Sequence, residues 1–345
     1  MAQFQTLLNI VKGKTIALVY IFEKEDSPGF KHFLVWKDKI LIGWLKAIYE
    51  LDCLPYIMDV RTFLQKASNH SLPHIDYVVN LNSGCYTLST MGLVPAICSF
   101  LDIPCIPCDA TAILSAENKK ISNFVAKGLG LYTPNTLNGS SKVGIYRPNN
   151  LGNSIGIKIG SNTENGQASG IFQEFIPGYD ITIPFAFNPE LKDIDVFPPI
   201  LYLPNSLDPY WIFDEESKKE DTGLRTVSFR SIEQSAREQL LSLIKTFDIK
   251  TFGRIDARIK TADTQLTDRI ADGSFDLENT YFIEINAMPT VEKGDGLDLA
   301  FKEAQNKETN RFHRCVSHYI SAIPQPTING FLLFVSILAF STSKY

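Results

Sequence analysis

Two patterns of hydrophobic and polar positions alternate along the first third of the chain. Continuous apolar runs of strand length, KTIALVYIF and IDYVVNLN, predict strands that are covered on both faces. The segment WKDKILIGWLKAIYEL has helical spacing at Leu41, Trp44, Leu45 and Ile48. LPYIMDV predicts a further strand and GLVPAICSFLDI a further helix. This alternation predicts an open α/β unit over residues 1–108.

The remaining chain is richer in strands. Residues 109–131 have the pattern of one helix that stops at the Gly128/Gly130 region. KVGIYRPNN, the turn LGNSIG and IKI predict a strand, a glycine-containing turn and a second strand. GIFQEFIPGYDITIPFAF predicts a hairpin that turns at Pro177-Gly178. An amphipathic helix is expected in SIEQSAREQLLSLIKTFDI, followed by the strand pair GRIDARI and YFIEINAM.

Polar side chains occur at alternate positions of these last two strands. Glu284 and Asn286 share one face of their strand, and Arg254, Asp256 and Arg258 share one face of theirs. If the strands pair, Asp256 meets Glu284 and Asn286 across the ladder. Two carboxylates and an amide suit Mg²⁺, which keeps room for phosphate oxygens. A cross-strand network of ion pairs is the alternative interpretation.

Composition narrows the class of protein. The chain has 345 residues, of which 44% are hydrophobic and 21% charged, which is ordinary for a soluble globular protein of two or three packed units. The net charge of -5 argues against nucleic-acid binding. MAQFQTLLNI lacks the features of a secretory signal, so we expect a cytoplasmic location. The six cysteines do not form a disulfide scaffold, and Cys105 and Cys108 of CIPC are interpreted as an incidental pair.

The apolar tail INGFLLFVSILAF is shorter than the roughly 20 residues that a spanning helix needs. A docked terminal helix or strand is therefore expected in place of a membrane anchor, and a peripheral membrane contact stays open.

The order of the segments resembles the ATP-grasp superfamily and, within it, the D-alanine–D-alanine ligases. LDIPCIPCDATAILSAENKKISNFVAKGLGLYTP is similar to the segment that joins the first domain to the central helix, and YRPNNLGNSIGI to the phosphate loop. FQEFIPGYDITI resembles the strand and turn that hold adenine and ribose, and FDEESKKE the closing loop. GRIDARI and EINAMP resemble the paired metal-binding strands. The similarity covers about residues 75 to 300, and no single motif carries it.

The resemblance implies an ATP-grasp fold of three α/β domains, with the nucleotide between the central and C-terminal domains. The expected units are the N-terminal domain 1–108, the central subdomain 109–170, the catalytic domain 171–325 and the apolar tail 326–345.

The resemblance also implies catalytic and metal-binding residues. Asp256, Glu284 and Asn286 would bind two Mg²⁺ ions, with Mn²⁺ as an alternative, that bridge the phosphates of ATP. Arg254 would stabilise the tetrahedral intermediate. Lys218 would be the phosphate contact of the closing loop, with a part in both catalysis and nucleotide binding.

The implied nucleotide site departs from the family at four positions. Arg147 replaces a phosphate-binding lysine, Gln173 an adenine-binding glutamate, and Asp180 a longer ribose-binding glutamate. Asn123 occupies the position where a phosphate-contacting lysine is expected, and Lys119 and Lys120 lie nearby as substitutes. The nucleotide-binding residues are expected to be Lys119, Arg147, Ser154, Gln173, Glu174, Asp180 and Lys218.

Both substrate pockets differ from the family pattern. Glu23 and Glu25 lie where a glycine-rich turn would present the partner of the first substrate's amine, and that turn is missing. Asp295 falls where a small hydroxyl residue would bind the second substrate's carboxylate, so we expect D-alanine to be a poor substrate.

The resemblance implies an ATP-dependent carboxylate–amine ligase that forms an amide through an acyl phosphate and releases ADP and phosphate. The expected partners are small carboxylates and amines, with amino acids favoured, and a homodimer is among the open oligomeric states. One alternative is a ligase of a secondary-metabolite pathway that joins an amino acid to a small molecule. Another is a nucleotide-binding homologue without catalysis, for which Asn123 is the main support.

Overall fold

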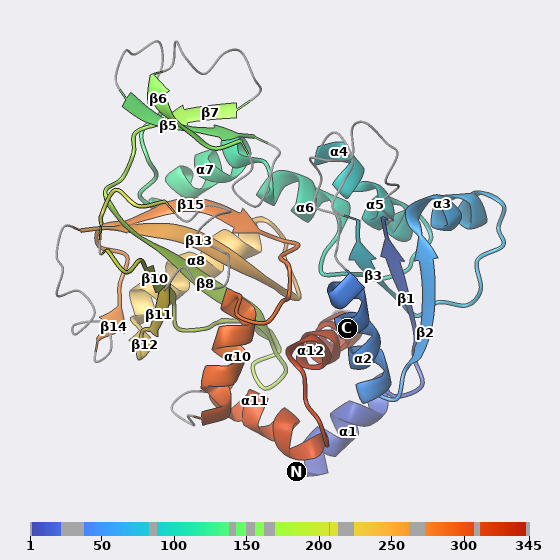
Figure 1. Ribbon diagram of the computed structural model, residues 1–345. Helices are drawn as coiled ribbons and strands as arrows, with labels where there is room; N and C mark the ends of the chain where they lie inside the picture. The colour runs from blue at the N-terminus through green and yellow to red at the C-terminus, as the bar shows by residue number, and fades with distance from the viewer. Residues whose placement is uncertain are drawn as a thin grey trace.

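Three main β-sheets and the helices around them make up the molecule (Figure 1). The computed structural model describes residues 2–21, 38–82, 88–137, 143–149, 156–161, 170–206, 208–212, 224–261, 273–306 and 311–342.

The N-terminal sheet is parallel, with strand order β2-β1-β3-β4. Its central strand β1 is buried along most of its length, as its continuous apolar sequence predicts. The α/β unit expected in this region is thereby confirmed. Its strands are β1 (Thr15–Tyr20), β2 (Leu54–Asp59), β3 (Tyr77–Leu81) and β4 (Cys105–Ile106), and its helices α1 (Ala2–Val11), α2 (Asp38–Glu50), α3 (Val60–Ser68), α4 (Leu88–Met91) and α5 (Leu93–Phe100).

Two helices, α6 (Ala110–Ala116) and α7 (Lys119–Gly128), lead away from this sheet. The prediction of one continuous helix over 109–131 is therefore wrong. The break comes at Asn118, which has an extended backbone and accepts a hydrogen bond from the N–H of Ile121 at 3.1 Å. Asparagine is a favourable N-cap because its side chain replaces the carbonyl that a first helical turn lacks.

A small antiparallel sheet, β6-β5-β7, lies beside α7 (Figure 1). It consists of β5 (Val143–Pro148), β6 (Lys158–Ser161) and β7 (Gly170–Gln173). The predicted hairpin at Pro177-Gly178 is wrong, because β7 pairs with β5 whereas the following strand β8 (Gly178–Asn188) belongs to the large sheet. Gly178 has φ +145°, and a Cβ there would overlap the carbonyl of Ile259. Glycine is therefore required where the chain crosses from the small sheet to the large one.

The large sheet has strand order β11-β10-β8-β13-β15, with β9 paired to β8. Helix α8 (Gln234–Thr246) packs against β9, and α10 (Gly296–Asn306) packs against β8 and β10. The other strands of the large sheet are β9 (Asp193–Val196), β10 (Ile200–Leu203), β11 (Arg225–Ser228), β13 (Phe252–Lys260) and β15 (Thr280–Asn286), and β12 (Ser231–Ile232) pairs with β14 (Ser274–Phe275).

The chain ends in α11 (Arg311–Ala322) and the apolar helix α12 (Ile328–Thr342). Helix α12 packs against α1, α2 and β8 (Figure 1). The side chains of Phe331 and Phe334 are fully buried. The prediction of a docked terminal element is confirmed. In the part of the chain that the structure describes, no helix combines the length and hydropathy needed to cross a membrane. The five cysteines in that part are buried, unpaired thiols.

Candidate nucleotide and metal site

The centre of the candidate site is the antiparallel pair β13 and β15. Their register sets Asp256 opposite Glu284 and Arg254 opposite Asn286, with an irregularity just after Asp256. The Asn286 Nδ2 donates to Asp256 Oδ2 at 2.6 Å. The predicted meeting of Asp256 with Glu284 and Asn286 across the ladder is therefore present.

The orientation of Asp256 is also set from the opposite side, by β8. Thr182 pairs with Asp256 in the register between β8 and β13, and its hydroxyl donates to Asp256 Oδ1 at 2.9 Å. Gly296, at the start of α10, packs closely on Thr182 and would have no room for a side chain. These contacts fix the position of the carboxylate relative to both neighbouring strands.

Glu284 faces two buried cations from the other part of the site. Lys119 Nζ on α7 lies 3.2 Å from Glu284 Oε2, and Arg147 Nη1 on β5 lies 3.9 Å from it. Burial raises the pKa of Glu284, but the positive charges of Lys119 and Arg147 outweigh that effect and lower it to about 2. Glu284 is therefore ionised at neutral pH, as a ligand for a cation must be.

Three of the positions that depart from the family pattern contact one another. Arg147 Nη2 donates to Gln173 Oε1 at 2.7 Å, and Gln173 Nε2 donates to Asn123 Oδ1 at 3.2 Å and to the carbonyl of Pro134 at 3.0 Å. Asn123 and Arg147 both donate to the carbonyl of Ile283, each at 3.1 Å. Burial lowers the pKa of Arg147. The side chains at 123, 147 and 173 thus form a buried network that joins α7 and the small sheet to β15.

Arg254 lies at the other end of the ladder, beside the carboxylate of Asp256. Its Nε is 3.3 Å from Asp256 Oδ2. Burial lowers the pKa of Arg254, but the negative charge of Asp256 and smaller contributions from Tyr202 and Asp295 raise it above its usual value. The guanidinium stays charged and lies next to the predicted metal ligands.

The predicted ribose and adenine contacts take part in bonds within the protein. Asp180 Oδ2 is 2.8 Å from Nη1 of Arg258, the third polar residue on its face of β13. Glu174 Oε1 accepts from the backbone N–H and the side-chain amide of Asn135, at 2.9 Å and 2.8 Å. Of the other predicted residues, Ser154, Lys218, Glu23 and Glu25 lie outside the described part of the chain.

Asp295 is the N-cap of α10. Its Oδ1 accepts from the backbone N–H of Asp298 at 3.1 Å, and its Oδ2 accepts from that of Glu292 at 2.6 Å. Burial raises the pKa of Asp295 to about 6, although these two N–H groups and Arg254 act in the opposite direction. A role in holding the start of α10 is thus visible, and contact with a second substrate remains a prediction.

Two residues of the site could not be found from strand alternation. Thr182 lies on β8, and Glu117 lies between α6 and α7, far in sequence from the residues they contact. Glu117 Oε1 accepts from the N–H groups of Ala287 and Met288, at 3.1 Å and 3.4 Å, directly after Asn286. Burial and then the charge of Glu284 raise the pKa of Glu117 to about 7. The one local feature of the sequence that points to Glu117 is its position directly before Asn118, the N-cap of α7.

The donor set suits a hard cation such as Mg²⁺. Asp256, Glu284 and Asn286 offer two carboxylates and an amide, and the amide nitrogen of Asn286 is bound to Asp256, which leaves the amide oxygen as the ligand atom. Within the described residues there is no cluster of three or more histidine, cysteine or carboxylate side chains arranged for a metal. A set of three protein oxygens is typical of Mg²⁺ sites that are completed by phosphate and water.

Solved structures of three ligases share this architecture. The D-alanine–D-alanine ligase from Bacillus anthracis complexed with ATP has a TM-score of 0.55 and 14% identity, over 90% of this chain and 98% of that chain. The VanG D-Ala:D-Ser ligase from Enterococcus faecalis has a TM-score of 0.57 and 14% identity, over 90% of this chain and 99% of that chain. A D-alanyl-alanine synthetase A from Vibrio cholerae has a TM-score of 0.59 and 12% identity, over 89% of this chain and 98% of that chain. The chain has the fold of the D-alanine–D-alanine ligases.

This likeness confirms the ATP-grasp fold that the order of the sequence segments indicates. No family model matches the chain, and neither does any curated protein sequence. At 12–15% identity the likeness shows the fold alone.

Proposed function

We propose that the protein is an ATP-dependent ligase that joins a small carboxylate to an amine, with amino acids as the favoured substrates. The observation that carries this proposal is the pairing of Asp256 with Glu284, with Asn286 bound to Asp256 and Arg254 beside it. In an ion-pair network on a solvated face, the cations would be exposed to solvent. Lys119 and Arg147 are instead buried against Glu284. The ligases that share the fold, one of them described with ATP, support the same class.

The reaction follows from the chemistry of a carboxylate, which is a poor electrophile. An oxygen of the substrate carboxylate attacks the γ-phosphorus of ATP, the bond to the bridging oxygen breaks, and ADP leaves. The amine then attacks the acyl carbon, phosphate leaves, and the amine loses a proton to solvent. Mg²⁺ held by Asp256, Glu284 and Asn286 would offset the phosphate charge. Arg254 donates hydrogen bonds to the oxygens on which charge builds up.

The test is ADP formation with a panel of amino acids, alone and paired with other carboxylates, in the presence of Mg²⁺. We expect turnover that depends on both a carboxylate and an amine, and D-alanine alone is expected to give little. Arg254→Met should lower turnover by about a hundredfold, since one lost donor to a developing oxyanion costs that much. Lys260→Met, an exposed position of the same strand, is the matched control.

Binding of ATP without ADP formation for any substrate pair would favour the alternative of a nucleotide-binding protein without catalysis. Failure to bind ATP at all would overturn the proposal.

A further inference from the structure

Arg258 is a buried arginine that the proposed chemistry does not use. It follows Arg254 and Asp256 on the same face of β13, and only 5% of its surface is exposed. A buried guanidinium is costly unless its donors are paired. The bonds that pair it therefore show what it holds in place.

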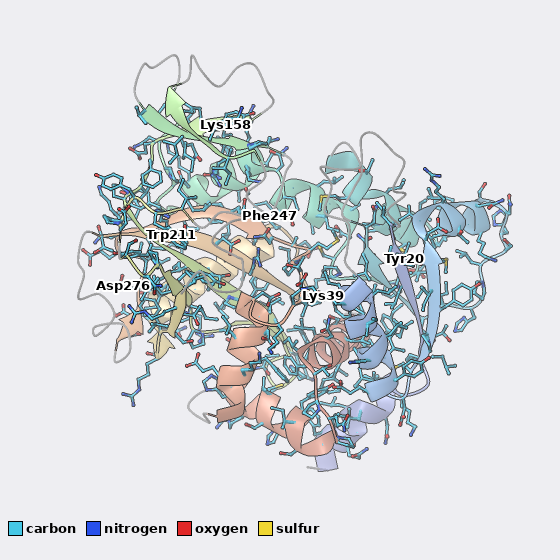
Figure 2. The ribbon with its side chains drawn as sticks, viewed as in Figure 1. Tyr20, Lys39, Lys158, Trp211, Phe247 and Asp276 are labelled. Carbon is cyan, nitrogen blue, oxygen red and sulfur yellow. The ribbon has the colours of Figure 1, made fainter. Side chains whose placement is uncertain are left out.

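The guanidinium of Arg258 connects three separate segments. Its Nε donates to the carbonyl of Ile176 at 2.6 Å, in the crossing between β7 and β8. Its Nη2 donates to the carbonyls of Pro209 and Trp211, at 3.1 Å and 2.6 Å, in the segment that follows β10. Its Nη1 donates to Asp180 Oδ2 at 2.8 Å, at the start of β8. Figure 2 shows Trp211 between the small sheet that carries Lys158 and the region of Asp276.

An aromatic contact adds to this arrangement. The Cζ of Arg258 lies 4.9 Å from the ring centroid of Phe175, and the Phe175 ring stacks on that of Tyr210 at 6.0 Å with an interplanar angle of 14°. The guanidinium thus holds the segment before β8 against the segment after β10 with both hydrogen bonds and a cation–π contact. A lysine could not do this, because it lacks the planar fork of five donors.

Within the described part of the chain, Asp180 is the one side chain among the hydrogen-bond acceptors of Arg258, and it is the predicted contact of the nucleotide sugar. We propose that Arg258 is a positioning residue that fixes the carboxylate of Asp180 so that it accepts hydrogen bonds from the ribose hydroxyls. Arg258 thereby determines how strongly the protein distinguishes a ribonucleotide from a sugar without these hydroxyls. This inference rests on the proposed function, because it takes ATP as the ligand.

The experiment measures the dissociation constants of Mg·ATP and Mg·2′,3′-dideoxy-ATP by titration calorimetry. Wild type is expected to bind ATP about tenfold more tightly or better, which is the usual effect of hydrogen bonds to a charged group. Arg258→Lys and Arg258→Met should bring the ratio of the two dissociation constants close to one. They should do so by weakening the binding of ATP, with much less effect on the binding of the dideoxy nucleotide. Lys260→Met, exposed two positions further along β13, should keep the wild-type ratio.

A purely structural role for Arg258 would weaken both nucleotides equally and leave the ratio unchanged, which would overturn the inference. If circular dichroism shows that the Arg258 variants do not fold, Asp180→Asn is used for the test. This variant must also lose the preference for ATP over the dideoxy nucleotide. A wild-type protein that binds both nucleotides equally well contradicts the inference but leaves the proposed function intact. A wild-type protein that binds neither overturns the proposed function as well.

Discussion

Glu284 carries opposing demands that explain its surroundings. A metal ligand must be ionised, and the charges of Lys119 and Arg147 lower the pKa of this half-buried carboxylate to about 2. The same two cations would face the phosphates of a bound nucleotide. Glu284 therefore connects the predicted metal site on β15 to the predicted phosphate contacts on α7 and β5.

Substitution of the ligands on β15 tests this assignment. Glu284→Gln and Asn286→Ala should each lower ADP formation by about a hundredfold, since metal-borne stabilisation of charge contributes several kcal/mol to catalysis. Both variants should keep the circular dichroism spectrum of the wild type. Near-normal ADP formation in both would remove these residues from the metal site.

Asp295 provides a pH-dependent prediction. A carboxyl whose pKa in the folded state is about 6, above its ordinary value of about 3.9, binds its proton more tightly in the folded than in the unfolded chain. The stability it contributes is therefore present below about pH 4 and is lost as the pH rises through 6. Asparagine also caps helices but does not ionise in this range. Asp295→Asn should gain unfolding free energy relative to wild type, on the order of 1–2 kcal/mol, between about pH 4 and pH 7.

Urea denaturation of both proteins at several pH values measures this difference. A difference that stays constant over the range would show that the folded-state pKa of Asp295 is not raised.

The residue scale also shows what sequence can predict about a site. The strand period of two places Asp256, Glu284 and Asn286 on the proper faces, and the observed register brings them together. Thr182 and Glu117 contact the same strands from β8 and from the turn before α7, and no local pattern encodes such contacts. Sequence therefore brings the predicted ligands together on one face, but it does not indicate the residues that orient them.

At the scale of elements, the two wrong predictions have separate causes. The apolar positions of 109–131 continue through Asn118 without a change of period, so only the capping residue marks the break between α6 and α7. Pro177-Gly178 has the composition of a turn, but the pairing of β7 with β5 and of β8 with β13 decides that the chain crosses between sheets. Strand partners are long-range properties, which local turn chemistry does not determine.

Helix α12 offers a test of how closely two elements can approach. Gly330 lies against the carboxylate of Glu50 on α2, which also accepts hydrogen bonds from Tyr319 and Thr327. Gly330→Ala should destabilise the fold by about 1–3 kcal/mol, because the added methyl group overlaps Glu50 and forces the helices apart. Thermal unfolding followed by circular dichroism measures the effect.

The matched control for this prediction is Gly128→Ala, at the last position of α7. Nothing lies within 4 Å of a Cβ at that position, so the change should be neutral or stabilising by up to about 1 kcal/mol. Equal melting temperatures for the two variants would mean that α12 does not pack closely on α2.

At the scale of the whole molecule, the site exists only when distant parts of the chain are assembled. Lys119 comes from α7, Arg147 from β5 and Glu284 from β15, and their contacts join the small sheet to the large one. The parallel N-terminal sheet is held to the large sheet in part by α12, which packs on both α2 and β8. The unfolded chain has no equivalent set of ligands.

Mg·ATP should therefore stabilise the native state by mass action alone. At about 100 times its dissociation constant, it is expected to raise the unfolding free energy by about 2.7 kcal/mol. Because the phosphates and the carboxylates of Asp256 and Glu284 are all negative, ATP with EDTA in place of Mg²⁺ should give much less stabilisation. Asp256→Asn should reduce the effect of Mg·ATP, whereas Lys260→Met should not. Thermal unfolding with and without each ligand measures these shifts, and equal stabilisation by ATP in EDTA would contradict a metal site formed by β13 and β15.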